Sequence, residues 1–219
     1  MIRNIDINEI SDGKLYTAND MVKADCHDCK GCSDCCRGMG SSILLDPMDI
    51  WRLSHCLQMS FEEMLDKHIE LGMVDGMILP NLKMTEGTDA CSFLNEEGRC
   101  RIHPYRPGIC RLFPLGRIYE ENGFKYFLQI HECAKSDRTK VKVKKWIDMP
   151  NLKNYEKYID DWHGFIMQCS GAIETLSDQE QRTLTLYVLR AFFQTAYESE
   201  EFYEEFYGRL RNVKEMFGF

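Results

Sequence analysis

This sequence lacks several features, and each absence argues against one class of protein. No uninterrupted apolar segment approaches the roughly eighteen residues that a membrane-spanning helix needs, so we expect no membrane partner. The opening segment 1–20 has neither the apolar core nor the small-residue cleavage site of a signal peptide. We therefore expect a cytoplasmic protein whose thiols stay reduced.

Positive charge and nucleotide-binding motifs are also scarce. The net charge is −8, whereas proteins that bind phosphate backbones carry clustered lysine and arginine. The short basic run 135–145 is more typical of a solvated surface than of a binding patch. The chain has no dinucleotide-binding glycine motif, phosphate-binding loop, HExxH or nucleophile elbow. Nucleic acid is therefore not expected as a partner, and nucleotide or serine-hydrolase chemistry has no support.

Cysteine, by contrast, is abundant and clustered. The segment 26–36, CHDCKGCSDCC, contains five thiols, and three more follow at Cys91, Cys100 and Cys110. A C-x2-C loop turns the backbone so that two sulfurs converge on one ion, and its repetition is a strong signal. Core cysteines instead recur at helical or strand periods. The pattern predicts a metal site rather than disulfides or simple packing.

The order and spacing of the cysteines resemble those of a known family. The segments that carry the resemblance are CKGCSDCCR from Cys29 to Arg37, the stretch from Asp46 to Leu53, and CSFLNEEGRCRIHPYRPGICRLFP from Cys91 to Pro114. Together they are similar to the YkgJ family, also called the CxxCxxCC zinc- or iron-chelating domain, over about residues 26–135. The flagellin lysine N-methylases carry a similar module with a divergent second half.

The resemblance, carried over residue by residue, implies eight thiolate ligands. They are Cys29, Cys32, Cys35, Cys36, Cys91, Cys100, Cys110 and, in the HEC tripeptide, Cys133. Cys56 and Cys169 fall outside this pattern and lie within helical periods, so we expect them in the core. Cys26 extends the C-x2-C register but precedes the family motif, and its role stays open.

The cysteine spacing leaves the metal undecided between zinc and an iron–sulfur cluster. Cys26, Cys29, Cys32 and Cys36 spell the C-x2-C-x2-C-x3-C run of bacterial ferredoxins, but Arg37 stands where those proteins have proline, and the run is not repeated. Zinc takes four ligands. Eight thiols therefore require either two metal centres or a multi-iron cluster.

Arginine and histidine accompany the cysteines. Five arginines crowd the second cysteine segment, and they either offset the charge of the thiolates or form a cradle for an anion or substrate. They are Arg99, Arg101, Arg106, Arg111 and Arg117. Three histidines lie near cysteines, but with eight thiols available we do not expect them as ligands; they are His27, His103 and His131.

Apolar periodicity predicts an α+β fold that is predominantly helical. A loop-rich cysteine lobe with a β-hairpin should pack on a C-terminal helical bundle. We expect an N-terminal segment 1–25, a cysteine-cluster region 26–135 and a helical region 136–219, the last two forming one compact domain. The expected elements are a short strand at 43–45, helices from 46 to about 57 and from 60 to about 71, a hairpin over 115–130, and three helices after residue 152.

Two functions of different class fit these observations. The first is a metal-binding protein without turnover, whose helical region presents a surface to a protein partner. The second is an enzyme that uses the centre, such as a protein or peptide lysine N-methyltransferase. The second rests only on the module shared with the flagellin methylases, and such analogy is weak evidence for activity.

Overall fold

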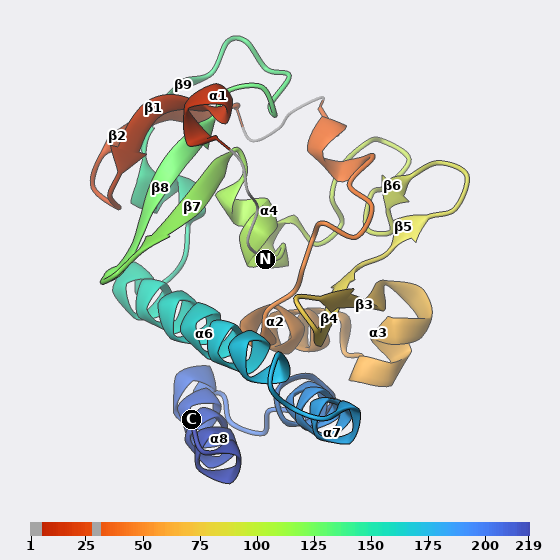
Figure 1. The fold of residues 1–219 in the computed structure, drawn as a ribbon. Helices are drawn as coiled ribbons and strands as arrows, with labels where there is room; N and C mark the ends of the chain where they lie inside the picture. The colour runs from red at the N-terminus through yellow and green to blue at the C-terminus, as the bar shows by residue number, and fades with distance from the viewer. Residues whose placement is uncertain (1–5, 28–31) are drawn as a thin grey trace.

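The computed structural model describes residues 6–27 and 32–219 (Figure 1). With 44% helix and 23% strand, in small antiparallel sheets followed by a helical C-terminal region, the chain has the expected α+β fold. Over the described ranges, we find no helix that combines the length and the apolar character needed to cross a bilayer.

Two small sheets lie at one end of the molecule. The three-stranded sheet has the order β1-β8-β7, and its β7–β8 hairpin confirms the predicted one. A two-stranded sheet pairs β2 with β9, so the N-terminal segment pairs with a strand more than a hundred residues away. The elements are α1 (Ile7–Ile10), β1 (Ser11–Tyr16), β2 (Met21–Asp25), β7 (Leu115–Glu120), β8 (Gly123–Gln129), β9 (Thr139–Lys142) and α5 (Val143–Ile147).

A second group of elements precedes the cysteine-bearing loops. Asp46, followed by Pro47, caps one helix and a capping box at Ser60 begins the next, as their sequences predict. The segment 43–45 is extended and bonds to β4 through the Leu45 N–H and the Ile43 carbonyl. The elements are α2 (Pro47–Leu57), α3 (Phe61–Lys67), β3 (Ile69–Val74), β4 (Met77–Leu82), β5 (Met84–Thr85) and β6 (Ala90–Cys91).

The prediction of a helix running to about Leu71 was wrong. Helix α3 ends at Lys67, and Ile69 begins β3, which pairs in antiparallel register with β4. The turn between these strands is Asp75-Gly76, with φ of 49° and 80°. An Asp-Gly pair is among the strongest hairpin signals because both residues tolerate positive φ. Ile69 continues the helical spacing of the preceding apolar residues, but it is fully buried as part of a strand. Strand pairing therefore decides its structure.

Three helices form the C-terminal region, as predicted. They pack through a cluster of aromatic rings, in which Trp162 lies 5.1 Å from Phe192 and Phe206 lies 5.7 Å from Phe192. Figure 1 shows the longest of them, α6, crossing the middle of the molecule between the sheets and the other two helices. The helices are α6 (Leu152–Ile173), α7 (Asp178–Leu189), which continues as the π-helical segment η3 (Arg190–Gln194), and α8 (Phe202–Phe217).

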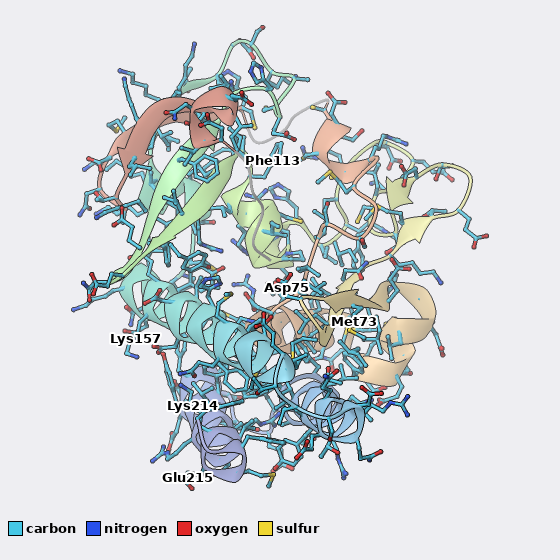
Figure 2. All side chains as sticks on the ribbon, in the orientation of Figure 1. Met73, Asp75, Phe113, Lys157, Lys214 and Glu215 are labelled. Carbon is cyan, nitrogen blue, oxygen red and sulfur yellow. The ribbon has the colours of Figure 1, made fainter. Side chains whose placement is uncertain are left out.

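The β3–β4 hairpin joins the cysteine-bearing half to these helices. Its turn lies beside α6, where the Ser170 hydroxyl donates to the Asp75 carbonyl at 2.8 Å (Figure 2). The Ile78 N–H donates to the Thr185 hydroxyl on α7, also at 2.8 Å. Buried apolar residues of both halves belong to one continuous core. The cysteine-bearing loops are therefore supported by the helical region.

Glycine substitutions on two elements test this packing. Gly116 on β7 faces Phe127 on β8, and a Cβ there would overlap the ring. We expect Gly116→Ala to lower the free energy of unfolding by about 1–3 kcal/mol. Gly171, exposed on α6, has open space, so Gly171→Ala should raise it by about 0.5–1 kcal/mol. Urea unfolding followed by circular dichroism measures both; a shift of the same sign in the two variants would contradict the packing described.

Candidate metal centre

Eight cysteines from separate parts of the chain line one partly open cavity of about 180 Å³. Seven of them belong to the predicted ligand set, and the eighth is Cys26, whose role the spacing left open. Cys29, the remaining predicted ligand, lies outside the described residues. The cysteines that line the cavity are Cys26, Cys32, Cys35, Cys36, Cys91, Cys100, Cys110 and Cys133.

Backbone hydrogen bonds fix the first cysteine segment against the second. Cys35 and Cys36 lie on the short 3-10 helix η1 (Asp34–Cys36). Directly after it, Arg37 forms a β-bridge with Ala90, and the Gly38 N–H donates to the Asp89 carbonyl at 2.8 Å. These contacts hold η1 next to β6, which ends at Cys91.

A tight loop brings Cys100 back towards Cys91. Leu94 and Cys100 form a β-bridge, and the Arg101 N–H donates to the Phe93 carbonyl at 2.9 Å. The Asn95 side chain accepts the Arg99 N–H at 2.7 Å and closes the turn. The chain then passes through the 3-10 helix η2 (His103–Tyr105) into α4 (Gly108–Leu112), which carries Cys110.

Among the described residues, Cys36, Cys91, Cys100 and Cys110 influence one another electrostatically, and we call these four the inner quartet. Burial raises the pKa of Cys110 well above its ordinary value, and the neighbouring charges of Cys91, Asp49, Cys36 and Cys100 raise it further. Burial also raises the pKa of Cys91 to about 11. Burial and neighbouring like charges together make joint ionisation of these thiols costly unless positive charge is supplied.

Cys36 differs from the other members of the inner quartet. A hydrogen bond from the Cys35 thiol, assisted by the positive charges of Arg106 and Arg37, lowers the pKa of Cys36 to about 7. Arg106 lines the cavity, contacts His103 through Nη1, and has a buried Nε without a partner among the described residues. The cavity thus holds one thiol that ionises near neutral pH beside a cation.

The five arginines singled out in the sequence have different surroundings. Arg99 and Arg106 line the cavity. Arg101 is exposed and donates to the Ser92 carbonyl at 2.8 Å. Arg111 is buried and donates to three backbone carbonyls, so its role is to hold the loop. Arg117 lies among aromatic rings on β7, with its guanidinium 5.4 Å from the centre of the Phe124 ring.

The other cysteines and histidines largely match their expected surroundings. Cys169 is fully buried and Cys56 packs against the core, as predicted. Of the three histidines near cysteines, His103 lines the cavity. His27 lies 3.7 Å from Asp137, and His131 is exposed.

The donor chemistry of the cavity fits a thiophilic metal. Sulfur is its dominant donor, and thiolate sulfur is the preferred donor for zinc and iron–sulfur clusters. Apolar side chains such as Phe113, Leu115 and Trp146 complete the walls (Phe113 is labelled in Figure 2). Within residues 6–27 and 32–219, however, no three histidine, cysteine, aspartate or glutamate side chains are arranged as ligands of one ion. The described thiols share a cavity without forming a finished coordination sphere.

Thiol alkylation of the metal-free protein tests the electrostatics of this cavity. We expect the pH profile of Cys36 alkylation to have its midpoint near pH 7, and that of Cys91 near pH 11, because only thiolates react. Arg106→Gln removes a charge that favours the Cys36 thiolate, so its midpoint should rise and its rate at neutral pH should fall. Tandem mass spectrometry resolves the sites; identical profiles for Cys36 and Cys91 would contradict the assignment.

The sequence was compared with models of known protein families, and a family model matches it. The family model CxxCxxCC, described as "Putative zinc- or iron-chelating domain", matches residues 28–139. The matched segment covers half of the chain and contains all eight predicted ligands. No solved structure matches this protein. On the strength of the family match, this chain belongs to the CxxCxxCC family of zinc- or iron-chelating domains.

Proposed function

We propose that this protein binds zinc or an iron–sulfur cluster through the thiolates that surround the cavity. The observation that carries the proposal is the convergence of eight cysteines, from segments up to a hundred residues apart, on one cavity. The proposed ligands are the eight predicted cysteines, with Cys29 contributed from outside the described residues. Cys26, buried in the cavity wall, is a further candidate ligand.

The inner quartet supplies one complete ligand set in this proposal. Four thiolates satisfy a tetrahedral zinc ion, and four also hold one iron–sulfur cluster. Burial chiefly, and the neighbouring charges in addition, raise the pKa of Cys110 and Cys91, and a bound cation would offset both effects. The remaining predicted ligands, Cys29, Cys32, Cys35 and Cys133, form a second set of four or complete a larger cluster.

Metal binding should also order the loops. The described thiols share the cavity but are not arranged as a finished ligand set, so binding has to draw the sulfurs together. Ligands that converge only on binding couple metal affinity to the folding of the segments that carry them. The centre therefore stabilises the lobe in which it forms.

The size of the cavity favours metal binding over the alternative of a methyltransferase at this site. Pockets for small molecules and cofactors commonly enclose about 300–1,000 Å³. The thiol-lined cavity encloses about 180 Å³, which suits an ion or a cluster better than a nucleoside-bearing methyl donor. The alternative of a lysine N-methyltransferase therefore rests on the resemblance of the module alone.

Metal and acid-labile sulfide analysis of protein purified without oxygen tests the proposal. We expect either iron with stoichiometric sulfide and a brown charge-transfer band, or colourless protein that contains zinc. Cys100→Ser removes one thiolate of the inner quartet. Its metal content should fall to about half if there are two four-thiolate centres, and close to zero if there is one shared cluster.

The matched control is Cys56→Ser on α2, because Cys56 lies outside the cavity. This variant should retain the metal content of the wild type. Folded wild-type protein that contains neither metal after anaerobic purification, and takes up neither on reconstitution, would refute the proposal.

A further inference from the structure

Helix α4 carries Cys110, but the contacts that hold its first turn come from distant helices. Pro107 precedes the helix and provides no side-chain cap. The Gly108 N–H instead donates to Asp49 Oδ1 at 2.8 Å, across 59 residues of sequence. A carboxylate of α2 thus satisfies a donor at the start of α4, where an unpaired N–H would otherwise be buried.

Asp49 is itself held in place from two directions. Its Oδ2 accepts the Asp46 N–H at 3.2 Å, and Asp46 Oδ1 accepts the Asp49 N–H at 2.9 Å, which completes the capping box of α2. The Tyr158 hydroxyl on α6 donates to the same Asp46 Oδ1 at 2.9 Å and accepts the Met48 N–H at 3.0 Å. Only 4% of Asp49 is exposed, so solvent cannot replace these contacts.

Gly108 also packs directly against α6. A Cβ at this position would collide with the Tyr155 hydroxyl and would come within 3.7 Å of Asp49 Oδ1. Arg117, which is partly buried, donates to the same Tyr155 hydroxyl at 3.5 Å. The start of α4 is therefore clamped between α2 and α6, and Cys110 follows two residues later.

We propose that Asp49 is a positioning residue for Cys110, so that the metal affinity of the cavity depends on the clamp that α2 and α6 form around Gly108. The inference rests on the proposed metal-binding function and extends it to residues that contribute no ligand. Partners that orient metal ligands typically account for about 10–100-fold in affinity. Tyr155 and Tyr158 lie beyond the segment that matches the family model, so part of the metal site's support comes from the helical region.

Two substitutions at Asp49 test its hydrogen bond to Gly108. Asp49→Ala removes the acceptor for Gly108, and we expect the Zn²⁺ affinity, measured against a chromophoric chelator under anaerobic conditions, to fall about 10–100-fold. Asp49→Asn keeps an oxygen for Gly108 and gives up only the acceptor for the Asp46 N–H, so it should lose clearly less. Asp66→Ala, an exposed aspartate on α3, is the control and should bind as the wild type does. Wild-type affinity in Asp49→Ala, or equal losses in Asp49→Ala and Asp49→Asn, would overturn the proposal.

A second pair of variants keeps the test decisive if Asp49→Ala fails to fold. Gly108→Ala should weaken Zn²⁺ binding, because its methyl group displaces α4 from Tyr155. Tyr155→Phe removes the colliding oxygen, so Gly108→Ala/Tyr155→Phe should recover affinity relative to Gly108→Ala. Absence of any loss in Gly108→Ala, or of recovery in the double variant, would count against the clamp.

Hydrogen exchange of the metal-free proteins distinguishes failure of the clamp from failure of the metal site. The amides of Gly108–Leu112 should exchange faster in Asp49→Ala than in the wild type, whether or not the protein binds metal. Unchanged exchange at α4 overturns the clamp and leaves the metal-binding proposal intact. Faster exchange in Asp49→Ala, together with a wild type that binds no metal, would support the clamp while removing its link to metal affinity.

Discussion

The burial of several ionisable thiols around one cavity is the constraint on which the rest of this structure depends. A buried thiol resists ionisation, and like charges nearby add to that resistance. Burial first, and neighbouring charges second, raise the pKa of Cys91, Cys100 and Cys110, whereas Cys35 and two arginines favour the thiolate at Cys36. Holding such a group together requires a rigid frame, because nothing within the group favours proximity until a cation enters. The surrounding elements supply that frame.

The frame consists mainly of backbone contacts within the cysteine-bearing lobe, and side chains of the helices support it. The Arg111 guanidinium donates hydrogen bonds to backbone carbonyls. Arg37 and Ala90 join two cysteine segments by a β-bridge. The helices contribute through Asp49 and Tyr155, which meet at Gly108. The lobe is rich in irregular backbone, but its loops are fixed wherever a thiol must face the cavity. Metal binding then completes the ordering of a lobe whose backbone contacts already hold the cysteine segments next to one another.

Much of this arrangement could be predicted from the sequence, and most of the exceptions depend on contacts between residues far apart in the chain. The cysteine spacing of segment 26–36 predicts a metal site, an N-cap followed by proline locates α2, and a capping box with apolar periodicity locates α7. Strands β1 and β2 were missed because their partners lie more than a hundred residues away, and pairing decides their structure. Asp75-Gly76 was a readable local signal, and weighing it would have predicted the β3–β4 hairpin. The meeting of Asp49 with Gly108 has no sequence signal, because it arises only from tertiary packing.

The pairing of β2 with β9 has a consequence for how this module is built into proteins. Asp25 and Thr139 are partners in that pair, and the Thr139 hydroxyl donates to the Asp25 carboxylate at 3.3 Å. The cysteine-bearing segment thus leaves and rejoins the rest of the chain at nearly the same point in space. A segment whose ends lie side by side can be inserted into a host fold without pulling the host apart. The ends of this segment would therefore allow its insertion into another fold. That fold would have to replace the helices that support Cys110.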